Sequence, residues 1–165
     1  MCKIYSYEEA KTTFPEIFSE IPIKLAELCK KMDIDVLGVK DDDTFCGSIK
    51  YNIERKKFQI YVNSSHSYGR IRFTVAHELA HYFLHNDIVR VRAIEDKTVN
   101  RIQGIYNQLE TEANQLASKI LMPEENIFMD VKQQTGNKID VSSLAAKYAV
   151  SESSMGYRLT NLGIL

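Results

Sequence analysis

The sequence predicts a mixed α+β fold for a chain of 165 residues, on two observations. Three short apolar runs between residues 34 and 62 have the character of strands. Two longer stretches, residues 67–84 and 105–122, place apolar side chains at the spacing of helices. The length is that of one domain, or of one domain with a small appendage.

The first residues predict two helices. Ser6 and Glu9 have the spacing of a capping box, so a short helix begins there and ends near Pro15. We expect Pro22 in the first turn of the next helix, where proline is tolerated. That helix carries an amphipathic stripe, which consists of Leu25, Leu28, Cys29 and Met32.

Three strands are predicted next. Residues 34–39 and 45–51 are typical of short strands, and the polar residues 41–43 form a turn between them. Residues 58–62 are a stronger strand pattern, because they are rich in β-branched and aromatic residues. A helix is then expected over about residues 67–84, with one stripe formed by Ile71, Val75 and Leu79.

The second half is predicted to be mainly helical. Residues 86–104 are polar, and we interpret them as a mobile or substrate-selecting segment in which Ile88–Val91 pairs as a strand. A strong helix is expected over about residues 105–122, ended by Pro123, and a short helix after it. The chain closes with a compact unit of two helices, residues 141–148 and 152–162, with a turn at Val150 and Ser151 and a stop at Gly163.

Composition excludes several classes of protein. The formal net charge is −1, whereas a protein that coats nucleic acid is usually basic. No apolar run has the roughly 18–20 residues of a membrane span, and the first residues lack the apolar core of a signal peptide. The three cysteines lie far apart, which argues against a disulfide framework. We therefore expect a cytoplasmic protein with no membrane contact.

His77-Glu78-Leu79-Ala80-His81, within a predicted helix, carries the chemistry. Residues four apart lie one turn apart on the same face, so both imidazoles can reach one Zn²⁺. Glu78 is rotated by roughly 100° from His77 and can accept a proton beside the metal. Such a pattern arises by chance in on the order of 1% of chains of this kind, so a metal site is the better interpretation than a helix with two ordinary histidines.

The third ligand must come from another element. His85 lies eight residues from His77, about 12 Å along the helix, so it cannot join the pair on one ion and is expected to hydrogen-bond from outside. His66 is interpreted as a surface residue.

The second strong helix offers two carboxylates, Glu110 and Glu112. Glu110 shares a stripe with small and apolar residues, where a carboxylate needs a cation, whereas Glu112 lies on a stripe that is typical of solvent. We favour Glu110 as the ligand over Glu112, and Asn114, one turn on, could orient a ligand.

At this point the chain resembles the ImmA/IrrE-type metallopeptidase family. The resemblance runs through residues 70–85 and resumes at residues 110–117 and 120–123, with weaker similarity at residues 60–63 and 158–163. Two mild departures are Ala80, where the family usually has Gly, and Leu116, where Phe is common. Neither departure removes a ligand.

The resemblance implies a gluzincin, in which zinc is held by His77, His81 and Glu110. It implies a small zincin-like α+β domain, whose sheet of three to four short strands packs on the His-bearing helix and the Glu-bearing helix. We expect a core at residues 1–134 and a helix-turn-helix-like unit at residues 135–165 packed on it. One Zn²⁺ is expected, although two imidazoles and a carboxylate also suit Mn²⁺ or Fe²⁺.

The resemblance also implies a role. The family cleaves or inactivates Xre-type repressors of phages, mobile elements or stress responses, which are often encoded nearby. We therefore expect a metallo-endopeptidase whose partner is such a repressor, with Glu78 as the general base. Zincins commonly bind substrate as an added strand, and the predicted edge consists of Ile60, Tyr61, Val62 and Asn63. A second oxyanion donor is expected among Tyr106, Tyr148, Tyr157 and Arg158.

Three alternatives stay open. The two C-terminal helices could belong to a DNA-binding regulator, but residues 135–165 hold only three basic residues against two acidic ones, which argues against direct DNA binding. The chain could be the toxin or regulatory half of a two-gene module without proteolysis. A structural zinc site is the third alternative, and it would need a fourth ligand such as Cys46 or His66. The sequence sets no oligomeric state.

Overall fold

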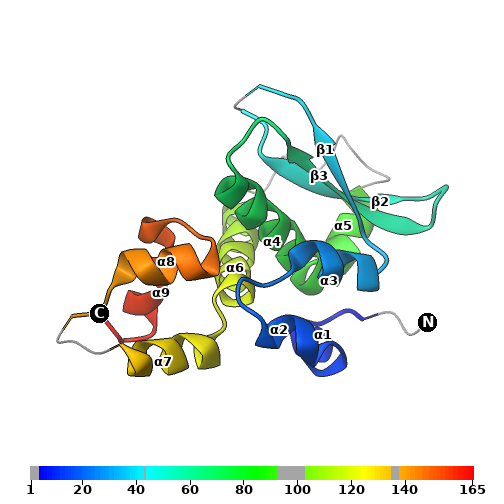
Figure 1. The fold of residues 1–165 in the computed structure, drawn as a ribbon. Helices are drawn as coiled ribbons and strands as arrows, with labels where there is room; N and C mark the ends of the chain where they lie inside the picture. Colours follow the sequence, from blue (N-terminus) through cyan, green and yellow to red (C-terminus); the bar gives the residue numbers. More distant parts are fainter. Residues whose placement is uncertain (1–3, 43, 93–102, 135–137) are drawn as a thin grey trace.

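The computed structural model describes residues 4–42, 44–92, 103–134 and 138–165 (Figure 1). Within these residues it is a mixed α+β structure of three strands and nine helices, as the sequence predicts. The side chains of residues 91–92 and 103–106 are outside this description. Residues 93–102, the greater part of the predicted substrate-selecting segment, also lie outside it.

Three short helices open the fold: α1 (Tyr7–Thr13), α2 (Pro15–Ser19) and α3 (Leu25–Lys31). The Ser6 hydroxyl accepts from the Glu9 amide, as the capping box predicts, and α1 ends before Pro15. Helix α2 was not expected; it begins at Pro15 itself, where the missing amide hydrogen costs nothing. The placement of Pro22 in a helix is wrong, because α3 begins three residues later.

The sheet has three strands, β1 (Asp35–Val39), β2 (Gly47–Asn52) and β3 (Lys57–Asn63), in the order β1-β3-β2. Strand β1 pairs parallel to β3, and β2 pairs antiparallel to it, with Gly47 opposite Val62. Most of β3 is buried, which explains its strong apolar pattern.

The predicted substrate edge is therefore wrong. Residues Ile60, Tyr61, Val62 and Asn63 belong to the central strand, whose hydrogen-bonding groups on both sides pair with β1 and β2. A central strand cannot accept an added chain. The two edges of the sheet are β1 and β2.

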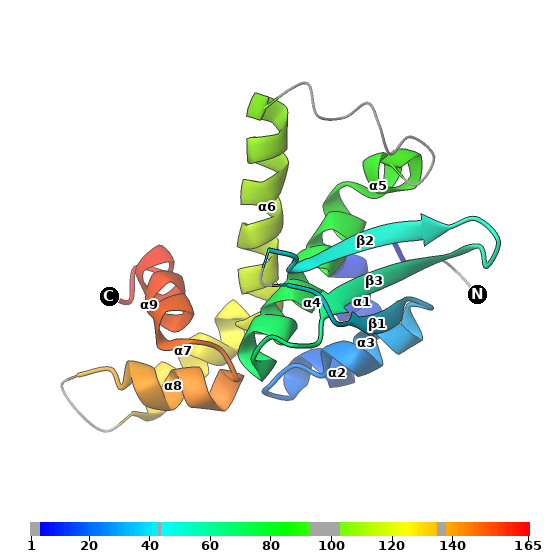
Figure 2. The same ribbon diagram turned by 90° about the horizontal axis from the view of Figure 1, so that it is seen from above.

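Two long helices form the centre of the molecule. Helix α4 (Tyr68–Leu84) packs against β2 and β3, and α6 (Gln103–Leu121) packs along α4 (Figure 2). Buried alanines on both helices, Ala76, Ala80, Ala113 and Ala117, have no exposed surface and let the backbones approach closely. In Figure 2 the N-terminal half of α6 extends past the sheet.

Helix α5 (Asn86–Arg92) occupies the place where the sequence suggested a strand over Ile88–Val91. In this helix Val89 is buried on one side, while its neighbour Ile88 is partly exposed. Such one-sided burial is typical of an amphipathic helix. Among the described side chains of α5, Val89 is thus the apolar one that is directed inward, which a short apolar run alone cannot reveal.

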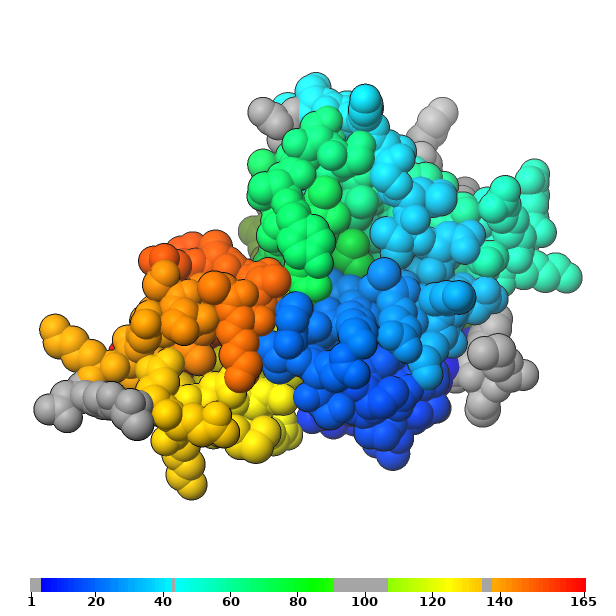
Figure 3. All heavy atoms as spheres, in the orientation of Figure 1, coloured from blue at the N-terminus to red at the C-terminus, as the bar shows by residue number. Residues whose placement is uncertain are grey.

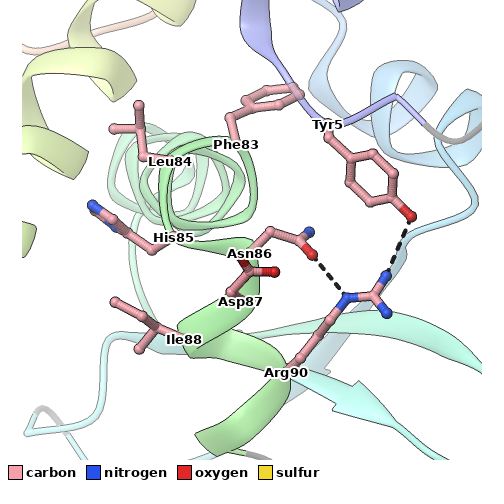
Figure 4. Close-up of a pocket in the computed structure, with 8 residues that line it drawn as sticks. All are labelled: Tyr5, Phe83, Leu84, His85, Asn86, Asp87, Ile88 and Arg90. Carbon is pink, nitrogen blue, oxygen red and sulfur yellow. Dashed lines mark hydrogen bonds between the residues drawn. The ribbon is translucent and has the colours of Figure 1, made fainter.

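Arg90 holds α5 against the sheet and the N-terminal segment. Its Nε donates to Asn86 Oδ1 at 2.8 Å and its Nη2 to the Tyr5 hydroxyl at 3.3 Å (Figure 4). The guanidinium also lies 5.1 Å from the ring centre of Tyr51 and 5.4 Å from that of Phe58. These cation–π contacts fix the helix that follows the His-bearing helix.

The chain ends with α7 (Glu124–Gln133), α8 (Val141–Tyr148) and α9 (Glu152–Asn161), which form a lobe beside the N-terminal helices (Figure 3). Asp140 caps α8 and Ser151 caps α9, and Gly163 follows α9 with a positive φ of 68°, the stop that the sequence predicts. In the described part of the chain, no helix combines the length and apolar character needed to cross a membrane.

Candidate metal centre

Three side chains from α4 and α6 bring their ligand atoms together. His77, His81 and Glu110 each direct one nitrogen or oxygen into a group whose atoms lie within 4.8 Å of one another. His77 Nε2 lies 3.1 Å from His81 Nε2. Glu110 Oε2 lies 3.2 Å from His77 Nε2, and Glu110 Oε1 lies 3.4 Å from His81 Nε2. The close approach of α4 and α6 through their alanines makes this arrangement possible.

The spacing of these atoms fits a metal ion. Ligands at 2.0–2.1 Å from a tetrahedral Zn²⁺ lie about 3.3 Å from one another. The two imidazole nitrogens lie 3.1 Å apart, and each has one Glu110 oxygen close by, at 3.2 Å and 3.4 Å, so the three groups are near enough to share one ion. Two imidazole nitrogens and a carboxylate oxygen are all electron-pair donors in this arrangement, and a cation between them removes their mutual repulsion.

Each imidazole is held on its opposite side. His77 Nδ1 lies 3.0 Å from Asn114 Oδ1, so the amide one turn beyond Glu110 orients this ring. His81 Nδ1 lies 3.0 Å from His85 Nδ1. The structure thus places Asn114 and His85, the two residues predicted to hydrogen-bond from outside, against one ligand histidine each.

Glu112 lies outside the group of three but is not a purely solvent-facing residue. Its Oε2 lies 3.1 Å from His85 Nε2, and Gln108 Nε2 donates to its Oε1 at 2.8 Å. The hydrogen bonds from Gln108 and His85 lower the pKa of Glu112 below its ordinary value. The stripe is solvent-exposed, as predicted, since the Glu112 side chain is 42% exposed, but the Glu112 carboxylate also reaches His85 at the end of α4.

The metal group faces a cleft of about 470 Å³ between α4, α6 and β2. The first residues of β2, Gly47, Ser48 and Ile49, form one wall, and Val89 of α5 contributes to it. Glu78 also lines the cleft, although its side chain is buried. An edge strand, a buried carboxylate and a metal-binding group therefore share one opening.

Gly47 allows β2 to reach this position. A Cβ atom at Gly47 would lie 2.3 Å from Thr74 Cγ2 and 2.8 Å from the Tyr61 carbonyl oxygen. The same Cβ would lie 3.6 Å from Glu78 Oε1, so the Glu78 carboxylate points toward the start of β2. The sequence shows a glycine here, but only the packing explains it.

The proposed fourth ligands of a structural zinc site do not join the group. Cys46 lies at the rim of the cleft, where Arg70 Nη2 contacts its sulfur at 3.2 Å. His66 is 9% exposed, so its interpretation as a surface residue is wrong; the buried Asn63 draws the turn inward, with its carbonyl accepting from the His66 amide. Among the described residues, the metal-binding group contains three members.

The predicted oxyanion donors lie elsewhere, where the structure describes them. Tyr148 is fully buried and donates to Asp130 Oδ2 at 2.9 Å, and Arg158 Nε donates to the Met122 carbonyl at 3.1 Å. Tyr157 is 75% exposed on α9. None of these three lines the cleft, and the side chain of Tyr106 is outside the described residues.

Fold and site together define a small α+β domain with two histidines and a glutamate arranged for one metal ion. The chain belongs to a peptidase family described as the IrrE N-terminal-like domain, which matches residues 29–160. No curated protein matches the chain significantly.

A solved structure, a Mycobacterium tuberculosis transcriptional regulator, is similar in fold, with a TM-score of 0.64 and 22% identity. The match covers 93% of this chain but 45% of the regulator, so this chain corresponds to about half of that protein.

Proposed function

We propose that this protein is a zinc-dependent endopeptidase with His77, His81 and Glu110 as metal ligands and Glu78 as the general base. The observation that carries the proposal is that His77, His81 and Glu110 bring their ligand atoms within 4.8 Å of one another, beside a cleft that Glu78 also lines. Membership of a peptidase family supports it. Three protein ligands are typical of catalytic zinc sites, whereas structural sites usually have four.

The chemistry divides between the metal and the chain. A bound Zn²⁺ supplies a Lewis acid that activates water and polarises a peptide carbonyl. Glu78 is adjacent to His77 in the helix but rotated off its face, so its carboxylate can take a proton without competing as a ligand. Its burial beside Gly47 excludes bulk water from the side of the carboxylate that faces β2.

We propose β2 as the strand that binds substrate, in place of the central strand. Strand β2 is an edge of the sheet, and Gly47, Ser48 and Ile49 line the cleft that holds the metal group. An extended peptide that pairs with this edge would gain main-chain hydrogen bonds and would run past Glu78. The packing of the sheet on α4 and α6 is, on this proposal, that of a zincin-like core.

The substrate we propose is an Xre-type transcriptional repressor encoded near this chain, cleaved in the cytoplasm. The resemblance to ImmA/IrrE-type peptidases supports this choice. The solved structure similar in fold is named a transcriptional regulator, which is consistent with a link to transcription control. Zn²⁺ is the metal we propose, and the same ligand set would also bind Mn²⁺ or Fe²⁺.

The division of the chain follows from this proposal: residues 1–134 form the peptidase core, and residues 135–165 form a helix-turn-helix-like unit that docks on it. Direct DNA binding by this unit has little support. Arg158, the basic residue of α9, is buried against the Met122 carbonyl, and Lys147 is paired with Asp130 at 2.6 Å. Few phosphate contacts are then available.

The test is metal analysis combined with cleavage of the neighbouring repressor in co-expressing cells. Glu78→Gln is expected to retain zinc and to lose cleavage, because the amide keeps the shape but cannot accept a proton. His77→Ala is expected to lose both. Glu54→Ala, in the exposed turn between β2 and β3, is the matched control and should cleave normally. Persistent cleavage by Glu78→Gln would exclude Glu78 as the general base. Zinc binding by the wild type without any cleavage would favour a regulatory role with a structural metal.

A further inference from the structure

The two ligand histidines are supported by different groups. An amide oxygen, Asn114 Oδ1, stands behind His77, whereas behind His81 there is a second imidazole, that of His85, and then a carboxylate, that of Glu112. The consecutive separations in the second series are 3.0 Å and 3.1 Å, both within hydrogen-bond range. The series therefore connects the surface of α6 to the metal group through the end of α4.

The positions of the hydrogens in this series follow from the chemistry of Glu112, its last member. A carboxylate only accepts, so His85 Nε2 carries a hydrogen and donates to Glu112. A neutral His85 then has a lone pair at Nδ1, and His81 Nδ1 must carry the hydrogen between the two rings. His81 Nε2 consequently has a free electron pair, and this atom is the one directed at His77 and Glu110.

We propose that Glu112 and His85 are positioning residues that fix the tautomer and the ring orientation of His81, so that its Nε2 can bind the metal. This inference rests on the proposed metal site and extends it to a residue that neither ligates nor touches substrate. Glu112 acts on His81 through His85. The effect is on metal affinity, because a ligand histidine held in the wrong tautomer presents a hydrogen where the ion should bind.

The surroundings of the series fit a role in orientation. The His85 side chain is 6% exposed, and Figure 4 shows that its ring projects away from the Asn86–Arg90–Tyr5 contacts on the other side of α5. Gln108, one turn before Glu112, holds the other carboxylate oxygen. Both carboxylate oxygens of Glu112 therefore have a hydrogen-bond partner within the chain, which is unusual for a glutamate on an exposed helix face.

The experiment measures the zinc affinity of the purified apoprotein by competition with a chromophoric chelator. Glu112→Ala should weaken zinc binding by about 10- to 100-fold, the usual range for loss of such an outer partner. Glu112→Gln keeps an oxygen that can accept from His85, so its affinity should stay within a few-fold of the wild type. Glu54→Ala removes an exposed carboxylate in the turn between β2 and β3 and should not change the affinity.

A double-mutant cycle separates positioning through His85 from a direct effect of the Glu112 charge. His85→Phe removes both ring nitrogens and should weaken zinc binding at least as much as Glu112→Ala. In the His85→Phe background, Glu112→Ala should then have no further effect. The visible spectrum of the Co²⁺-substituted protein should change in both single variants, since it reports the ligand field rather than the fold.

The outcomes distinguish this inference from the proposed function. If the wild type binds no zinc, the metal site itself is wrong. If the wild type binds zinc and Glu112→Ala binds it equally well with an unchanged Co²⁺ spectrum, the positioning role is overturned while the metal site stands. An additive effect of the two substitutions would also overturn it.

Discussion

The metal centre and the C-terminal helices use polar side chains in opposite ways. In the C-terminal lobe, polar groups close onto the chain itself: Asp130 accepts from both Lys147 and Tyr148, and Arg158 donates to the carbonyl at the end of α6. At the metal centre, two imidazole nitrogens and a carboxylate turn toward one another instead. The first arrangement is complete without a ligand, whereas the second could hold a cation.

This difference separates stability from function. Hydrogen bonds within the chain contribute a modest net stability of about 1 kcal/mol each and leave nothing to bind. On the proposed function, the electron-pair donors that face one another at the metal centre lower stability until an ion is present, and the ion serves the chemistry. Substitutions in the two regions should therefore affect different measurements.

The largest effect is expected for His81→Ala. Loss of one of three ligands should weaken zinc binding by more than 100-fold, because two ligands cannot hold the ion in place. Zinc should raise the unfolding temperature of the wild type, since a ligand at 100 times its Kd adds about 2.7 kcal/mol of stability. The same addition should not stabilise the variant. A variant that zinc still stabilises as strongly would contradict the ligand assignment.

Met155→Ala tests the opposite region. Met155 is fully buried on α9, so its truncation should lower the free energy of unfolding by about 2–5 kcal/mol. Urea unfolding of the apoprotein measures this loss, and the zinc affinity of the folded molecules should be unchanged. Tyr157→Ala on the same helix, at a residue that is 75% exposed, serves as the control and should change stability little.

Gly47→Ala should affect both stability and cleavage, because Gly47 lies where the sheet meets helix α4, which carries the two ligand histidines. The added methyl would overlap Thr74 and the Tyr61 carbonyl, so β2 must shift away from α4 at a cost of about 1–3 kcal/mol. Cleavage should fall as well, since the proposed substrate strand moves. Gly156→Ala is the control: no atom lies within 4 Å of its Cβ position, so stability should stay the same or rise.

The smallest effect is expected at alkaline pH, where the stability of both regions should fall. Burial raises the pKa of Tyr82 to about 12, and burial with the Asp130 contact raises that of Tyr148 above its ordinary value. A tyrosine in the unfolded chain ionises at about pH 10. Above that pH the native state binds more protons than the unfolded state, so the free energy of unfolding falls as the pH rises. Urea midpoints between pH 8 and 11 measure this fall.

Tyr82→Phe and Tyr148→Phe should each reduce the alkaline loss, one in each region. Identical pH profiles for the wild type and both variants would show that neither hydroxyl is protected by the fold. Tyr148→Phe should in addition lower stability at pH 7 by about 1 kcal/mol, since the Asp130 contact is lost.

Sequence patterns predicted correctly those features that depend on a single helix. The spacing of His77 and His81 and the apolar stripes of α4 and α6 indicated both long helices, and the stripe shared with alanines distinguished Glu110 from Glu112. The capping residue Ser6 was predicted for the same reason, since caps act over three residues.

Predictions failed where the answer depended on neighbours in space. An apolar strand is compatible with the centre or the edge of a sheet, so β3 was misplaced at the edge. His66 is buried by a turn that Asn63 organises, and Glu112 is held by His85 from the other long helix. Neither the order of strands in the sheet nor the contact between His85 and Glu112, which are 27 residues apart, can be detected from periodicity.

The order of residues along this chain determined which side chains could bind a metal, because a helix places residues four apart on one face whatever surrounds it. Tertiary structure alone decided which strand borders the cleft and which polar groups stand behind the histidines. Those features depend on how β2, α4 and α6 approach one another, and that approach is set by packing of small side chains between elements that are distant in the sequence.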